Sequence, residues 1–154
     1  MGLDMYLYRE TFVGGNHEYR DVQGTVELSY NNNDNERLPI NVDIKSLVSV
    51  TEHLLYWRKA NAIHGWFVDN CGDGEDNAQL MYVTEDKMKE LLETIDKQLK
   101  DKVSGILPLR SGFFFGNSEE KDAWYWDELK RTKKEFEKLL KEPGDHDYYY
   151  QASW

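Results

Sequence analysis

The period of the hydrophobic pattern changes along the chain, and this change is the strongest constraint on its fold. In the segment from Leu3 to Phe12, Leu3, Met5 and Leu7 alternate with Asp4, Tyr6 and Tyr8, as in a strand buried on one face. The alternation recurs over residues 24–30, and residues 38–44 could form a third short strand. From Thr51 onward, apolar residues instead recur every three or four positions, which is the helical period. Strands followed mainly by helices predict an α+β domain with a small, mostly antiparallel sheet.

About three helices are expected. The first begins after a Thr51 cap and runs to about Asn70, and its broad apolar surface predicts a central, mostly buried helix. The second covers 85–102, capped by Thr84, and a short strand is expected before it at 79–83. The third begins at Asn117 or Ser118 and runs to about Lys141.

The chain has 154 residues, and no internal repeat or linker divides it, so we expect a single domain over residues 1–142. Pro143 and Gly144 end the last helix, and residues 143–154 are expected to form an acidic, aromatic C-terminal tail. The tyrosines at 148–150 and Trp154 would be costly to expose, which favours a homo-oligomer that buries the tail. A frayed end is the alternative.

Charge and cysteine content exclude several classes of protein. The 29 Asp and Glu residues outnumber the 19 Lys and Arg residues, giving a net charge of −10, so direct nucleic-acid binding is not expected. A single Cys excludes a disulfide scaffold and, without an export signal, indicates the cytoplasm. No apolar run approaches the roughly 18 residues of a membrane span. Two roles are open for the excess of acidic residues: it keeps the protein soluble, or it mimics the phosphate backbone of a nucleic acid.

The segment 56–66 carries the strongest candidate site. Its side chains suit a planar anion: Trp57, Arg58, Lys59, Asn61 and His64. On a helix, Trp57, Asn61 and His64 share one face, as positions i, i+4 and i+7. Indole stacks on planar rings, cationic groups neutralise phosphate, and amide and imidazole groups give directional hydrogen bonds. The pattern predicts a small nucleotide-like ligand; the alternative is a buried helix whose Arg58 pairs with an acid.

Two aromatic segments could contribute to the same site. Three Phe residues between glycines, at 112–116, indicate a buried strand or the wall of a pocket, with Arg110 and Ser111 at its entrance. Trp124 and Trp126 cannot face the same partner from one helix, so at least one ring is expected at a surface or groove. Covering the sheet is the alternative role for both rings.

The sequence lacks the motifs that mark common enzymes and nucleotide-binding loops, so no catalytic residue and no cofactor are expected. Residues 69–76 resemble a calcium loop only loosely, because Leu80 stands where the bidentate Glu belongs. One Cys and four scattered His residues do not form a zinc site, and no metal is expected. Cys71 and His64 as a nucleophile–base pair would lie about 10 Å apart on an intact helix. An incidental thiol is the favoured interpretation.

Several motifs together resemble a family of small, uncharacterised phage and prophage proteins. They are Gly2-Leu3-Asp4-Met5-Tyr6-Leu7, Tyr56-Trp57-Arg58-Lys59-Ala60-Asn61-Ala62-Ile63-His64 with Trp66-Phe67-Val68, and Ser111-Gly112-Phe113-Phe114-Phe115-Gly116 ahead of Trp124-Tyr125-Trp126. The resemblance spans residues 2 to about 140 and excludes the Asn-rich segment 31–35 and the residues after Pro143. It implies expression in the host bacterial cytoplasm and supplies no catalytic residues.

Small accessory phage proteins without enzyme motifs often antagonise host defence, so the resemblance implies a counter-defence role. One mode is sequestration of a nucleotide-derived immune signal by the Trp57–His64 segment. The alternative is an acidic inhibitor that binds a host defence protein or a nucleic-acid-binding protein directly, including by nucleic-acid mimicry. Sequestration is preferred because its site is better defined. It requires those side chains to converge on a concave site, and their burial in a closed core would contradict it.

Overall fold

The computed structural model describes residues 2–15, 17–19, 26, 28–102, 105–107, 123–144 and 146–154. All strand pairings in this part of the chain are antiparallel, and three α-helices accompany them, so the predicted α+β class is confirmed. The elements in chain order are β1 (Asp4–Phe12), β2 (Leu28–Asn31), β3 (Arg37–Ile40), the 3₁₀ turn η1 (Ile44–Ser46), β4 (Ser49–Arg58), α1 (Asn61–Cys71), β5 (Met81–Val83), α2 (Glu85–Asp101), α3 (Ala123–Leu139) and β6 (His146–Ser153).

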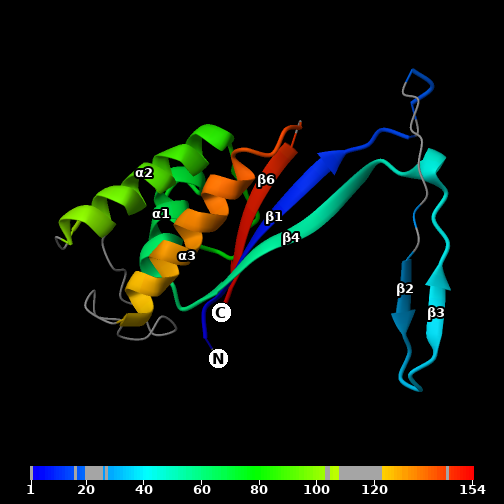
Figure 1. The fold of residues 1–154 in the computed structure, drawn as a ribbon, viewed down its shortest axis with the longest axis horizontal. Helices are drawn as coiled ribbons and strands as arrows, with labels where there is room; N and C mark the ends of the chain where they lie inside the picture. Colours follow the sequence, from blue (N-terminus) through cyan, green and yellow to red (C-terminus); the bar gives the residue numbers. More distant parts are fainter. Residues whose placement is uncertain are drawn as a thin grey trace.

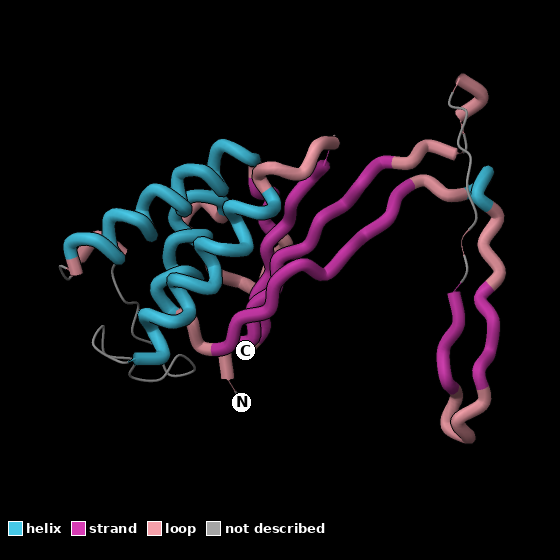
Figure 2. The backbone as a smooth tube through the Cα atoms, in the orientation of Figure 1, coloured by secondary structure: helices cyan, strands magenta, loops and turns pink. Residues whose placement is uncertain are grey.

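The main sheet has four strands in the order β4-β1-β6-β5. The three helices pack against one face of this sheet, and no described helix covers the other face (Figures 1 and 2). The far ends of β1 and β4 extend out of this body as a long two-stranded arm (Figure 1). Beyond that arm, β2 and β3 form a separate two-stranded sheet, the β2–β3 ribbon, which stands away from the body.

The C-terminal segment that we expected as a tail is a central strand. β6 pairs with β1 from Asp4↔Ser153 to Thr11↔His146, and with β5 on its other side. Tyr148 is 1% exposed and Tyr150 has no exposed surface. The expectation of a tail outside the domain is therefore wrong, because every second side chain of this segment enters the core. The argument that a homo-oligomer must bury these rings also fails, since the fold itself buries Tyr148 and Tyr150 and covers part of Tyr149 and Trp154.

The helix expected after Thr51 begins only at Asn61. The preceding residues form β4, which is paired with β1 along its whole length. Lys59 then turns the chain with a φ of 57°, in the left-handed region. Along the end of β4, buried and exposed side chains alternate in the order Leu55, Tyr56, Trp57, Arg58. The apolar spacing of this segment fits both periods, and pairing with β1 selects the strand.

The other predicted elements agree with the structure to different degrees. The strand at 79–83 and the helix at 85–102 are confirmed as β5 and α2, and the Thr84 hydroxyl caps α2 by accepting from the Lys87 N–H at 3.2 Å. The third helix is confirmed as α3 from Ala123; residues 117–122 and the Phe-rich segment 112–116 lie outside the described residues. The predicted strand 38–44 ends at Ile40, because the chain then turns into η1.

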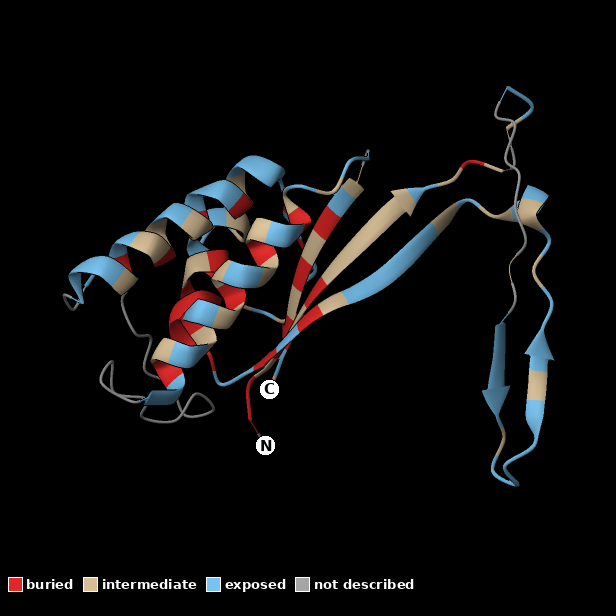
Figure 3. Ribbon diagram, in the orientation of Figure 1, coloured by how far each residue is buried: buried red, intermediate tan, exposed pale blue. Residues whose placement is uncertain are grey.

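One hydrophobic core fills the space between the sheet and the helices. Buried residues lie on the helix side of the sheet and on the inner faces of the helices (Figure 3). α1 is buried over most of its length, as expected for a central helix. Its Phe67 stacks on Tyr150, with ring centroids 4.1 Å apart and an interplanar angle of 12°. The main strand residues of the core are Leu3, Met5, Leu7, Leu55, Trp57, Met81, Val83, Tyr148, Tyr150 and Ala152.

Candidate functional site

Two rings of the predicted ligand site, those of Trp57 and His64, lie in the core. Trp57 has no exposed surface, and its Nε1–H donates to the Thr132 hydroxyl at 2.8 Å, which joins β4 to α3. His64 is 1% exposed. Hydrogen bonds join its Nδ1 to the Tyr150 hydroxyl at 2.7 Å and its Nε2 to the Asp76 carboxylate at 2.9 Å. Both rings therefore have structural partners and offer no stacking surface to a ligand.

The remaining candidate residues are dispersed. Arg58 is exposed at the end of β4, with its Nε 4.0 Å from the Asp4 carboxylate. Lys59, Asn61 and Trp124 line a crevice between the start of α1 and α3. Its volume of about 10 Å³ holds no more than one water molecule. The described candidates therefore do not form a pocket for a nucleotide.

Two further candidates, Arg110 and Ser111, lie outside the described residues.

The Cys71–His64 pair is not prepared for nucleophilic chemistry. Burial raises the pKa of the Cys71 thiol to about 11, so little thiolate exists at neutral pH. Both ring nitrogens of His64 are engaged by other side chains. Within the described ranges, no three His, Cys, Asp or Glu side chains gather as potential ligands of a metal ion. No described helix combines the length and apolar character that a bilayer span requires.

The open face of the sheet carries a row of aromatic side chains across all four strands. Tyr8 of β1 is the registered partner of His53 of β4 on one side and of Tyr149 of β6 on the other. Tyr149 is in turn the partner of Tyr82 of β5. The Tyr82 and Tyr149 ring centroids lie 5.6 Å apart, and those of Tyr8 and His53 lie 5.5 Å apart. These side chains point away from the helices, because the buried residues of each strand alternate with them.

A second pair of rings extends this row toward the end of the sheet that holds the N-terminus. Tyr6 and Tyr56 are registered partners, with ring centroids 5.5 Å apart. Tyr6 also lies 6.1 Å from Tyr8 and 5.2 Å from His53. We call the set the tyrosine face: Tyr6, Tyr8, His53, Tyr56, Tyr82 and Tyr149. Tyr56 and Tyr82 are 41% and 53% exposed, so the face is in contact with solvent.

Carboxylates border the tyrosine face at both ends. Asp4 accepts a hydrogen bond from the Tyr56 hydroxyl, and Asp147 accepts one from the Tyr82 hydroxyl at 2.9 Å. The hydrogen bond to Asp4 raises the pKa of Tyr56, and loss of hydration with the nearby charge of Asp147 raises the pKa of Tyr149. Both hydroxyls therefore stay neutral at physiological pH. The face presents tyrosine rings between the carboxylates of Asp4 and Asp147, and the Arg58 Nε lies 4.0 Å from the Asp4 carboxylate at one end.

The edge of the sheet beside this face is less open than the face itself. Arg131 of α3 donates from Nη2 to the Tyr56 carbonyl at 2.7 Å, which occupies an acceptor on the free edge of β4. The register with β1 shifts between Leu7 and Tyr8, where Leu54 is an extra residue in β4. Bulges and occupied backbone groups both disfavour the addition of another strand. This edge of β4 is therefore poorly suited to the addition of another strand.

Part of this face has a signal in the sequence, and part does not. The period-2 pattern at the N-terminus already places Asp4, Tyr6 and Tyr8 opposite the core. His53 and Tyr56 were missed because their segment was assigned to a helix. The same alternation within 146–153 could have placed Tyr149 on the open side.

Comparisons with family models, curated proteins and solved structures found no match to this chain.

Proposed function

We propose that this protein is a non-enzymatic binding protein that docks a basic segment of another protein on its tyrosine face. The observation that carries the proposal is the aromatic row spanning all four strands, left open by the helices and bordered by carboxylates. Tyrosine is enriched at protein interfaces because its ring buries a large apolar area while its hydroxyl keeps a polar partner. The face offers several such rings on a rigid sheet.

Charge decides between the kinds of partner. An aromatic sheet face can also stack nucleic-acid bases, but the phosphates would then approach Asp4, Asp147 and Glu10, the registered partner of Asp147, in a chain of net charge −10. Arg and Lys side chains are instead attracted both by the carboxylates and by the negative faces of the rings. A cation above an exposed aromatic ring gains roughly 0.5–1 kcal/mol. A basic protein segment therefore matches the chemistry of the face.

This proposal corresponds to direct inhibition, the second of the two modes considered from the sequence. Proteins that bind nucleic acids present such basic surfaces, and they belong to the partner class expected of a phage counter-defence protein. Sequestration of a nucleotide signal stays a prediction for which the described residues provide no assembled site. The tyrosine face supports direct binding better, because its rings are on the surface while Trp57 and His64 are in the core.

Partner capture followed by reconstitution tests the proposal. Wild-type protein, the double variant Tyr8→Ala/Tyr149→Ala and the control Tyr19→Ala serve as bait in bacterial lysate. Tyr19 is 78% exposed and lies outside the main sheet, so its loss removes an exposed tyrosine without touching the face. We expect a basic protein to be retained by wild type and Tyr19→Ala, and to be lost with the double variant. With that partner purified, the Kd of the double variant should rise at least about tenfold, the equivalent of about 1.4 kcal/mol.

Two results would contradict the proposal. Equal affinity of all three proteins for the purified partner would show that the tyrosine face is not the binding surface. A stoichiometric small-anion adduct in the native mass spectrum of the protein from defence-activated cells would favour sequestration instead. A salt titration adds a further check, because a contact between carboxylates and a basic segment weakens as ionic strength rises.

A further inference from the structure

The tyrosine face differs in charge between its two ends. Arg58 follows Tyr56 on the open side of β4 and is the registered partner of Asp4 of β1. At the opposite end of the face, Glu10 of β1 is the registered partner of Asp147 of β6. Residues 4 and 10 are six positions apart in one continuous strand, so the two ends lie about 20 Å from each other.

Two cationic side chains meet at the first of these ends. A Cβ at Gly2 would lie 3.4 Å from the Lys59 Cε and 4.0 Å from the Arg58 Nε, so both side chains pass beside Gly2. The Arg58 side chain is 65% exposed, and its ion pair with Asp4 is long, at 4.0 Å. Asp4 also accepts a hydrogen bond from the Tyr56 hydroxyl. We call Arg58 and Lys59 the basic end, because two cations there meet one carboxylate that is shared with a tyrosine.

The other end holds two carboxylates on neighbouring strands. Asp147 accepts from the Tyr82 hydroxyl at 2.9 Å, and Glu10 accepts from the Ser49 hydroxyl. Neither hydroxyl neutralises the charge of its carboxylate. Like charges directly opposite one another in a sheet are destabilising, so a cation at this position is favoured. We call Glu10 and Asp147 the acidic end.

We propose that the segment bound by the tyrosine face carries both signs of charge, with a carboxylate at the basic end and a lysine or arginine at the acidic end. This inference rests on the proposed function and specifies the chemistry of the partner. A segment that carries only cations would meet Arg58 and Lys59 with like charge. A nucleic-acid strand has the opposite mismatch, because its phosphates repeat along the whole face and reach the acidic end.

The length of the face sets the spacing of the two charges in the partner. An extended segment advances about 3.4 Å per residue, so its carboxylate and its cation should be about six residues apart. Alternate side chains of such a segment are about 7 Å apart. The rings of Tyr6 and Tyr8 lie between the two ends with centroids 6.1 Å apart, which suits contact with two successive alternate side chains.

Binding of two labelled peptides to the full chain tests the proposal. Both contain the same arginines and glutamates in equal number, with capped ends. The separated peptide holds the two signs of charge about six residues apart, and the alternating peptide interleaves them. Because both peptides are neutral overall, the net charge of −10 on the protein favours neither. We expect the separated peptide to bind about fivefold more tightly, because only it reaches both ends of the face.

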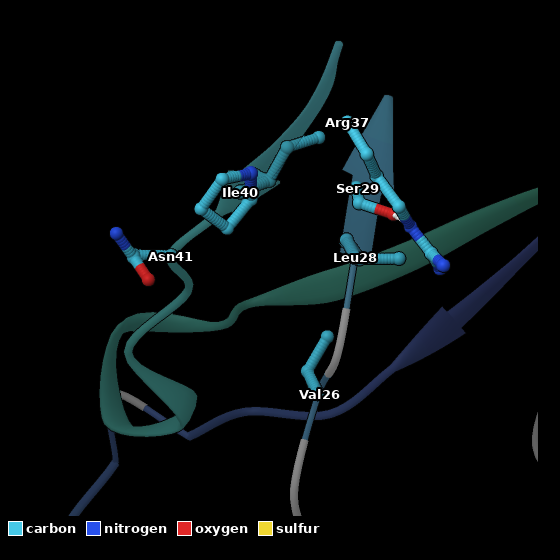
Figure 4. Close-up of a pocket in the computed structure, with 7 residues that line it drawn as sticks. Val26, Leu28, Ser29, Arg37, Ile40 and Asn41 are labelled. Atoms are coloured by element: carbon cyan, nitrogen blue, oxygen red, sulfur yellow. Dashed lines mark hydrogen bonds between the residues drawn. The ribbon is translucent and has the colours of Figure 1, made fainter. Parts of the chain in front are cut away.

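Two charge reversals locate the bound carboxylate. Arg58→Glu should raise the Kd of the separated peptide about fivefold and remove its advantage. Arg37→Glu is the matched control, because it changes the net charge equally on the β2–β3 ribbon, away from the main sheet. There the Arg37 Nε donates to the Ser29 hydroxyl at 2.6 Å beside an open groove of about 440 Å³ (Figure 4). This control should keep the preference of wild type.

An arginine-only peptide separates this inference from the proposed function. It should lose affinity with Tyr8→Ala/Tyr149→Ala, and in NMR spectra it should leave the Arg58 Nε–H signal in place, whereas the separated peptide should shift that signal. A double variant that binds the arginine-only peptide as wild type does contradicts the proposed function. If the double variant weakens binding but wild type holds the separated and alternating peptides equally, only the inference of two charges fails.

Two further results overturn the inference. One is an Arg58→Glu variant that keeps the wild-type preference for the separated peptide. The other is displacement of that peptide by a single-stranded oligothymidine at physiological salt, which would show that the basic end takes phosphate. Wild type that binds neither the separated nor the arginine-only peptide contradicts both the inference and the proposed function.

Discussion

The substitution Tyr150→Phe tests whether His64 belongs to the core of the protein or to a ligand site. It removes one oxygen atom and leaves the ring, which stays stacked on Phe67. The lost hydroxyl lies 2.7 Å from Nδ1 of His64, inside a region where both side chains are at most 1% exposed. Burial holds the pKa of Tyr150 well above its usual value, so the hydroxyl is protonated under ordinary conditions.

The expected cost follows from burial. A hydrogen bond between groups in water contributes little, but removing one partner from a buried polar nitrogen costs about 1–3 kcal/mol. The neighbouring substitution Tyr149→Phe removes the same atom from the open face of the sheet, where the expected change stays within about 0.5 kcal/mol. The two variants therefore differ only in which side of one strand loses a hydroxyl.

Urea denaturation measures both variants. For a denaturant slope of about 2 kcal/mol per molar, a loss of 2 kcal/mol lowers the midpoint by about 1 M. We expect this shift for Tyr150→Phe and almost none for Tyr149→Phe. Equal midpoints for the two variants would refute the reasoning, because they would show that the His64–Tyr150 pair adds nothing to the folded state.

Three further predictions concern charge, the thiol and the ribbon. Arg9 donates hydrogen bonds to Glu52 and Glu142 and thereby lowers the pKa of both carboxyl groups. The stability that this contact contributes is therefore present above about pH 4.5 and is lost as the pH falls. Arg9→Ala should flatten the acid side of a plot of urea midpoint against pH. The Cys71 thiol, with a pKa raised to about 11, should react slowly with iodoacetamide at pH 8 and rapidly after unfolding; equal rates would contradict its burial. Because its pKa is raised in the folded state, Cys71 stabilises the fold below its unfolded pKa of about 9, and that contribution is lost as pH rises toward 11. Gly15→Ala would place a Cβ 2.2 Å from the Ile44 carbonyl oxygen, outside the core. This variant should therefore speed hydrogen exchange at the base of the ribbon without changing the thermal midpoint of the body.

Strong local periodicity was enough to identify several elements. The alternation in β1 and the amphipathic stripe of α2 were both visible in the sequence, and the Thr84 cap marked the start of α2. The segment containing Trp57 fits either period, because apolar residues there are dense enough to satisfy a helix or a strand. Cross-strand pairing with β1 decides the outcome, and that partner lies about fifty positions earlier in the chain.

The candidate ligand site depended on this assignment. Trp57, Asn61 and His64 share a face only if one helix contains all three, and the turn at Lys59 separates the first from the other two. Arg58 and Trp57 are neighbours in the chain but point to opposite sides of a strand, one exposed and one buried. Residue types suited to a ligand were therefore recognised, but their convergence could not be derived from spacing alone.

By itself, the sequence determined the α+β class, the approximate number of helices and the acidic character of the surface, because these depend on local periodicity and composition. Only the tertiary structure decided that residues 146–153 become the central strand β6, and that rings from four strands meet on the tyrosine face. Strand order depends on pairing between segments that lie far apart in the sequence. Local periodicity and residue propensity do not show which strands become neighbours. The same pairing turns separate tyrosines into one surface.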